Sequence, residues 1–199
     1  MKRKPRKRKR APSKPEPAAS PAALHPRIEP RSLADYLKVM SRAVFQAGLS
    51  WAQINAQWEG MCEAFDQFEP AVVARYKHKD VRRILATPGV VHSERKVQAT
   101  IHNTRTLQAL EREHGSVRKY LRSFRSYQDL SADLQERFSH IGEISAYYFV
   151  FRVGETVPPF GRWVKTVKGD HPRIREMVKL FSKQNEAVME TMPESSRSA

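Results

Sequence analysis

Apolar residues recur every three or four positions along most of the chain from residue 33 onward, the spacing of amphipathic helices. One such stripe comprises Leu33, Leu37, Met40, Val44 and Ala47, and it predicts a first helix that ends at Gly48. Similar stripes predict helices over 50–68, from 70 to about 76, and over 80–86, 93–113, 116–124, 131–138, 143–151 and 172–191. No segment alternates as a half-buried strand does. The pattern therefore predicts an all-α fold of about nine short helices.

The joint between the first two helices, residues 45–51, combines a glycine, a helix cap and an aromatic ring. Gly48 ends one helix, and Ser50 with Gln53 has the form of a capping box that begins the next. Trp51 beside this joint suits one wall of a pocket, and it equally suits an ordinary core position. The pattern alone leaves both interpretations open.

A second glycine turn precedes the apolar helix near residue 143. Its residues Ile141, Gly142 and Glu143 are followed by Ser145 in the first helical turn. Free backbone N–H groups at such a helix start bind phosphate, and two helices joined in this way form a helix-hairpin-helix, which holds DNA by its backbone. Most glycine turns are plain connections, so this signal is weak alone. Residues 157–161, with two prolines, are predicted as a loop.

The positive net charge of the chain indicates that its binding partners are polyanions. The chain has 199 residues and a formal net charge of +15, and residues 1–10 hold eight Lys or Arg. We expect a disordered basic arm over 1–31, in which Lys2, Arg3 and Lys4 add salt-sensitive attraction to phosphates. The domain is expected over 32–160, followed by a C-terminal loop and helix over 161–199. Residues 31–199 still hold 26 basic against 19 acidic residues, so nucleic acid is the expected partner.

The composition does not indicate a membrane protein or a secreted protein. No apolar run approaches the roughly 20 residues of a membrane span, and the charged N-terminus leads into no apolar signal segment. The single cysteine, Cys62, excludes an internal disulfide. We expect a soluble monomer of the bacterial cytoplasm or nucleoid, or of the nucleus in a eukaryote.

Several short segments occur along the chain in the same order as in a known protein family. They are Phe45-Gln-Ala-Gly-Leu-Ser-Trp51, Phe65-Asp-Gln-Phe-Glu-Pro-Ala-Val-Val-Ala74, Pro88-Gly-Val-Val91, Lys96-Val-Gln-Ala-Thr-Ile-His-Asn103, Glu113-His-Gly-Ser116, Tyr120-Leu-Arg-Ser-Phe124, Ile141-Gly142 and Tyr147-Tyr-Phe149. Together they resemble the DNA-3-methyladenine glycosylase I family of the helix-hairpin-helix glycosylase superfamily, over roughly residues 33–155.

The resemblance implies an enzyme that flips an alkylated purine out of duplex DNA, stacks it on aromatic rings and hydrolyses its bond to the sugar. By position, it makes Trp51 the stacking wall, with Gln46 in the pocket-forming segment. It makes the turn at Gly142 the hairpin that, with Arg95, Lys96 and Arg122, would hold the DNA backbone. Tyr36, on the first helix, could add a hydroxyl to the pocket or pack at the helix surface.

The chain also departs from the family. The pocket carboxylate of the family falls at the position of Ala43, and the zinc of the family needs cysteines and histidines near both ends. Here His25 and His171 have no N-terminal cysteine beside them, so we predict no metal and no cofactor.

These departures leave two hypotheses open. One is a monofunctional DNA glycosylase of base-excision repair, because a cationic alkylated base leaves with little acid assistance. The other is a non-catalytic DNA-binding relative that keeps the fold.

Overall fold

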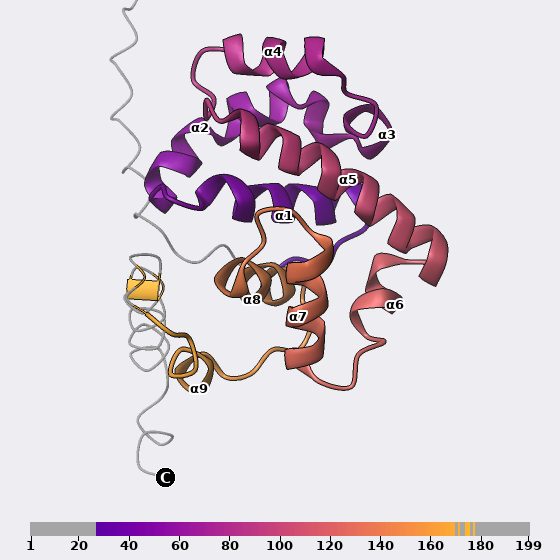
Figure 1. Ribbon diagram of the computed structural model, residues 1–199, viewed down its shortest axis with the longest axis vertical. Coiled ribbons are helices and arrows are strands. Elements are labelled where there is room, and N and C mark those ends of the chain that lie inside the picture. Colours follow the sequence, from indigo (N-terminus) through magenta and orange to yellow (C-terminus); the bar gives the residue numbers. More distant parts are fainter. Residues whose placement is uncertain (1–26, 170, 172–173, 176, 178–199) are drawn as a thin grey trace, which may run out of the picture.

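A computed structural model describes residues 27–169, 171, 174–175 and 177, and these residues form helices without any strand (Figure 1). Nine α-helices and one short 3-10 helix, η1, lie in this part of the chain. The prediction of an all-α fold with about nine helices is therefore confirmed for the described residues. The helices are α1 (Leu33–Gln46), α2 (Trp51–Ala64), η1 (Asp66–Phe68), α3 (Pro70–Val73), α4 (His78–Ala86), α5 (Glu94–His114), α6 (Val117–Leu121), α7 (Tyr127–Arg137), α8 (Glu143–Arg152) and α9 (Phe160–Trp163).

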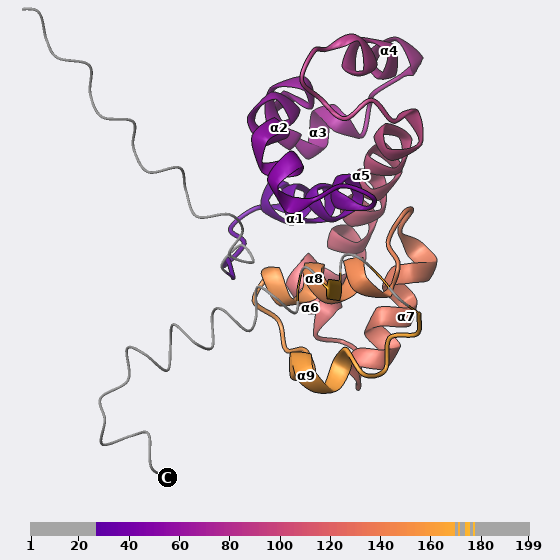
Figure 2. The ribbon, with the colours of Figure 1, turned by 90° about the vertical axis from the view of Figure 1, so that its left-hand side faces the viewer.

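The long helix α5 is the element that joins the two ends of the molecule. It packs against α1, α3 and α4 along its length and against α6 at its carboxyl end. Figures 1 and 2 both show α1 to α5 gathered together, with α6, α7 and α9 on the far side and α8 against α1. The loop between α1 and α2 and the turn before α8 are thereby placed on packed, rigid neighbours.

Aromatic side chains fill the core at both ends. Phe65 and Phe68 stack with ring centroids 5.0 Å apart, and both are fully buried. Toward the other end, Tyr147 stacks on Trp163 at 3.8 Å. Rings in such contacts add about 0.5–1.5 kcal/mol per pair beyond the area they bury.

Helix α2 is shorter than its apolar pattern predicts. It ends at Ala64, and Asp66, Gln67 and Phe68 then adopt left-handed backbone angles, with φ of 49°, 56° and 57°. The hydroxyl of Tyr76 donates a hydrogen bond to the carboxylate of Asp66, which holds this break in place. Residues 65–68 are therefore a kink that lets Phe68 turn into the core.

Several other boundaries differ from the prediction, and two of them have a clear cause. Helix α7 begins at Tyr127 and not at Ser131, because Ser126 accepts a hydrogen bond from the N–H of Asp129 and caps it. The predicted loop over 157–161 contains the start of α9, which follows Pro159. The buried ring of Trp163 stabilises that helix through its stack on Tyr147, a contact that local propensity does not reveal.

The predicted arm and the predicted final helix lie largely outside the described residues. Residues 27–31, assigned to the arm, contact the domain, where Arg27 donates to the carbonyls of Phe151 and Glu155 at 3.1 and 2.6 Å. Of the helix predicted over 172–191, only 174–175 and 177 are described. Within the described chain, none of the helices combines the length and apolarity needed to cross a membrane.

Candidate functional site

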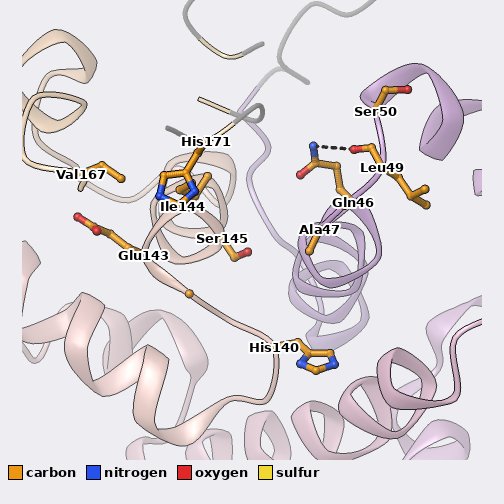
Figure 3. A pocket seen from close by; sticks show the side chains of 12 residues that line it. Gln46, Ala47, Leu49, Ser50, His140, Glu143, Ile144, Ser145, Val167 and His171 are labelled. Carbon is orange, nitrogen blue, oxygen red and sulfur yellow. Dashed lines mark hydrogen bonds between the residues drawn. The ribbon is translucent and has the colours of Figure 1, made fainter. Parts of the chain in front are cut away.

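A pocket of about 700 Å³ lies between the α1–α2 loop and the turn that precedes α8 (Figure 3). It is lined by Gln46, Ala47, Gly48, Leu49, Ser50, His140, Gly142, Glu143, Ile144, Ser145, Val167 and His171. The two sequence segments singled out for their glycines therefore meet at one cavity, although almost a hundred residues separate them.

Three local features hold the α1–α2 loop in its conformation on one side of the pocket. Gly48 adopts a φ of 83°, which glycine reaches without steric cost. The predicted capping box is confirmed, because Ser50 N–H donates to Gln53 Oε1 at 2.9 Å and Gln53 N–H donates to Ser50 Oγ at 3.3 Å. Lys96 Nζ donates to the carbonyls of Phe45 and Ala47 at 2.9 and 2.6 Å, which caps the carboxyl end of α1. The loop is thus preorganised.

Gln46 supplies the most unusual polar atom of the pocket. Its side chain is 1% exposed, and its Nε2 donates to the Leu49 carbonyl at 3.3 Å. Its Oε1 is buried without a hydrogen-bond partner among the described residues, and Figure 3 shows this oxygen on the side that faces α8. An unsatisfied buried acceptor costs about 1–3 kcal/mol. A ligand N–H group would remove this cost once the amide turns to expose the oxygen to the pocket.

The other side of the pocket is the start of α8. Gly142 is its N-cap residue, and the first N–H groups of a helix have no carbonyl partner within the helix. Ser145 is buried and faces the loop, whereas Glu143 lies with Val167 and His171 across the pocket from Gln46 (Figure 3). A carboxylate at this position also complements the positive end of the helix dipole. Ile141 is buried beneath the turn.

Trp51 does not line this pocket. Its ring is 2% exposed and packs against Tyr148 of α8, with centroids 4.8 Å apart and ring planes tilted by 41°. The face that a flipped base would use is therefore covered by Tyr148. Stacking of a base on Trp51 stays a prediction, and it requires the Tyr148 ring to move.

Tyr36 and Ala43 are also in the core. Tyr36 lies ten residues before Gln46, which is about 15 Å along α1, so it does not line the pocket. Burial raises the pKa of its phenol, against the opposing effect of a hydrogen bond from Arg118. Ala43, at the position expected to carry a carboxylate, is fully buried and contributes no charge.

The predicted DNA-binding cations fall in different places. Arg95 is exposed and lines a second hollow that adjoins the first at His140. Lys96 is turned toward the carbonyls that it caps, and Arg122 pairs with Glu155 at 2.8 Å, beside a third hollow. Lys2, Arg3 and Lys4 lie outside the described residues. The structure therefore brings Gln46, Gly142, Glu143 and Ser145 to one pocket, with Arg95 in the adjoining hollow and Arg122 at a separate one.

Sequence reasoning missed several pocket residues. Leu49 and His140 belong to the two glycine segments and could have been found from them. Ile144 and Val167 are apolar residues without a local signal, and only the packing of the chain places them here. No group of three His, Cys, Asp or Glu side chains within the described ranges is arranged to hold a metal ion.

Comparison with known proteins gives one consistent result. The family model described as methyladenine glycosylase matches residues 31–148, more than half of the chain. Among curated proteins, DNA-3-methyladenine glycosylase 1 of Escherichia coli is 32% identical over 83 residues, which is 42% of this chain and 44% of that protein. DNA-3-methyladenine glycosylase of Haemophilus influenzae is 26% identical over 91 residues, or 46% and 49%. The matched segment thus spans about half the length of these relatives.

Solved structures agree with the sequence comparison. A 3-methyladenine DNA glycosylase I variant in complex with 3-methyladenine superimposes with a TM-score of 0.58 at 25% identity, covering 64% of this chain and 80% of that one. The enzyme from Staphylococcus aureus gives a TM-score of 0.58 at 25% identity, covering 64% and 79%.

Proposed function

Because the chain belongs to the methyladenine glycosylase family, we propose that it is a DNA N-glycosylase of base-excision repair that flips out and excises an alkylated purine such as 3-methyladenine. The observation that carries this proposal is the buried, unsatisfied Gln46 oxygen in a pocket built from the α1–α2 loop and the turn before α8. The substrate class is that named for the relatives.

The pocket suits a planar base with N–H donors. Gln46 Oε1 would accept a hydrogen bond from the exocyclic amine, and Leu49, Ile144 and Val167 offer apolar surface to the ring. An alkylated adenine in DNA is cationic, so the base leaves as a neutral molecule with the electrons of the glycosidic bond, while water attacks the sugar carbon and loses a proton to the solvent. Such a reaction gains chiefly from positioning, and it needs little acid assistance. The nearby carboxylate of Glu143 favours the positive charge of the bound base.

Duplex DNA would be held around this pocket. The N–H groups at the start of α8 and the exposed Arg95 lie on either side of the turn at His140. Backbone contacts of this kind hold the duplex without reading its sequence. Lys2, Arg3 and Lys4 would add attraction that weakens with salt.

The test is release of 3-methyladenine from methylated duplex DNA by the full chain. Gln46→Leu removes the acceptor at nearly constant volume, and we expect it to slow release about tenfold, the effect of roughly 1.4 kcal/mol. Gln128→Leu, on the exposed face of α7, is the matched control and should release base at the wild-type rate. Absence of release above the spontaneous rate, with enzyme in excess, would exclude glycosylase activity.

Two observations favour a second candidate, a non-catalytic DNA-binding relative. Ala43 occupies the position of the expected carboxylate, and Tyr148 covers the face of Trp51. This candidate predicts salt-sensitive duplex binding that does not depend on methylation. Binding titrations with methylated, abasic and undamaged duplexes of one sequence distinguish the two, since a preference for the damaged duplexes contradicts the second candidate.

A further inference from the structure

Two arginines interact where α8 packs against α1, one helical turn before the pocket residue Gln46. Arg42 is on α1 and Arg152 ends α8, the helix that packs against α1. The Arg152 guanidinium carbon is 5.9 Å from the ring centre of Tyr148, and that of Arg42 is 4.6 Å from the ring centre of Trp58. Arg152 is 7% exposed, whereas Arg42 is partly open to solvent.

Several N–H groups of this arginine pair lack partners. Arg42 Nη2 donates to Asn55 Oδ1 at 2.7 Å. By contrast, Arg42 Nε and Arg152 Nε and Nη1 are buried and donate to no acceptor in the described part of the protein. Neither arginine forms a salt bridge with a described carboxylate, although Arg83, Arg118, Arg122 and Arg137 all do.

Two interacting arginines without a described carboxylate partner are energetically costly, although Arg152 lies over the Tyr148 ring and Arg42 bonds to Asn55. Burial lowers the pKa of Arg152 and of Arg42, and the charge of Arg152 lowers the pKa of Arg42 further. A buried charge without a counter-ion is strongly destabilising. Ala43, the next residue along α1, supplies no negative charge where the resemblance to the family would place one. A bound anion would remove both the repulsion and the unsatisfied N–H groups.

We propose that Arg42 and Arg152 form a binding site for a small oxyanion of the phosphate class. The planar fork of a guanidinium matches phosphate oxygens and donates paired hydrogen bonds to them. A phosphate group can carry two negative charges, which balances two arginines, whereas a single carboxylate balances one. Arg42 gives the anion a route from solvent, and Arg152 forms the inner end of the site.

Thermal unfolding of the full chain in the presence of inorganic phosphate, at constant ionic strength set with sodium chloride, tests the proposal. A ligand that binds only the folded state raises the unfolding temperature in a concentration-dependent way. We expect a saturable rise for the wild-type protein and no rise for Arg152→Met. Arg82→Met, which removes an exposed cation on α4, should keep the wild-type response and so controls for general charge effects.

Two further measurements keep the result decisive. Without phosphate, Arg152→Met should unfold at or above the wild-type temperature, because it removes an unpaired buried charge. Arg152→Lys, which keeps the charge and loses the fork, should respond to phosphate with weaker affinity. Repeating the titration with deoxyadenosine monophosphate and with a short undamaged duplex identifies the source, a free phosphate or the phosphate of a strand.

Three outcomes overturn the proposal. The first is an equal phosphate response in Arg152→Met and wild type. The second is no response of the wild type to phosphate, nucleotide or duplex. The third is an Arg152→Met protein that unfolds well below the wild type while the wild type ignores phosphate, which would mean that a carboxylate of this chain occupies the site.

Discussion

Single residues show most clearly what the sequence could and could not reveal about the site. Gln46 was predicted as a base-pocket residue from its place in a motif, and it lines the pocket between the α1–α2 loop and α8, while its role in base binding stays a prediction. Its unsatisfied oxygen depends on which groups fold around it, so no sequence pattern could have shown it. Trp51 was singled out by the same motif, but its environment is set by Tyr148, a residue 97 positions away.

The contact between the rings of Trp51 and Tyr148 gives a prediction about base binding. Tyr148→Ala would open a cavity against the face of Trp51 and lower the free energy of unfolding by about 3–5 kcal/mol. Free 3-methyladenine should then raise the unfolding temperature of this variant, because the base fills the cavity and stacks on the indole. Thermal unfolding with and without the base measures the effect.

Phe149→Ala is the matched control for this cavity. Phe149 is equally buried, but its ring contacts Tyr36 and not Trp51. Two results would count against Trp51 as a stacking wall. One is that the base raises the unfolding temperature of Phe149→Ala as much as that of Tyr148→Ala, and the other is that it does not raise the unfolding temperature of Tyr148→Ala.

At the scale of elements, the sequence predicted helices well where a cap and a stripe coincide. Helices α1 and α2 begin at serines whose capping boxes are complete. The prediction failed where the deciding contact is distant. Helix α9 depends on the stack between Trp163 and Tyr147, and the kink at residues 65–68 depends on a hydrogen bond from Tyr76. Neither contact leaves a local signal.

Lys96 gives a prediction at this scale, because it joins α5 to the end of α1. Lys96→Met removes two hydrogen bonds from a cation to the carbonyls of Phe45 and Ala47. We expect the free energy of unfolding to fall by at least about 1.5–3 kcal/mol, the range for one hydrogen bond to a charged group. Denaturant unfolding measures this change.

The neighbouring Arg95 provides the contrast. Arg95 is exposed, so Arg95→Met should leave stability unchanged. It should reduce the salt dependence of duplex binding by about one unit of slope, the effect of one lost phosphate contact. A different result would assign the DNA contact to Lys96, as the sequence predicted. In that case Lys96→Met would be as stable as wild type, and its duplex binding would show the reduced salt dependence.

For the whole molecule, charge is distributed unevenly. Residues 1–26 carry nine Lys or Arg and one acidic residue of a chain whose net charge is +15. The remaining residues are still basic, so the domain alone should bind duplex DNA. Composition reveals this division, but it does not show where the cations of the domain lie.

Deletion of residues 1–26 therefore gives a further prediction. We expect duplex affinity at low salt to fall and the slope of log affinity against log salt to become shallower, by about 0.9 for each phosphate contact that is lost. Fluorescence anisotropy over a range of salt concentrations measures both. An unchanged slope would show that the arm does not touch DNA.

Buried phenol groups make the stability of the folded protein decrease at alkaline pH. Burial raises the pKa of Tyr147 to about 12, and it also raises the pKa of Tyr36, Tyr76, Tyr120 and Tyr127. The unfolded chain releases these protons near its ordinary pKa of 10.0, whereas the folded chain retains them. Stability is therefore fully present below about pH 10 and falls as the pH rises toward 12.

Denaturant unfolding at about pH 8 and about pH 11 should show this loss. Tyr147→Phe should lose less stability than wild type over the same interval, because one of the phenols no longer ionises. An equal loss in both proteins would show that the ionisation of Tyr147 is not coupled to unfolding.

The three tryptophans of the chain sit in three different aromatic contacts, and this distribution provides natural optical reporters. Trp51 faces Tyr148 behind the pocket, Trp58 lies between Phe68 and the charge of Arg42, and Trp163 stacks on Tyr147 at the far end of the molecule. The emission of indole responds to nearby charge and polarity. Variants that retain one tryptophan each would therefore distinguish, by fluorescence alone, an event at the base pocket from one at the arginine pair or at α9.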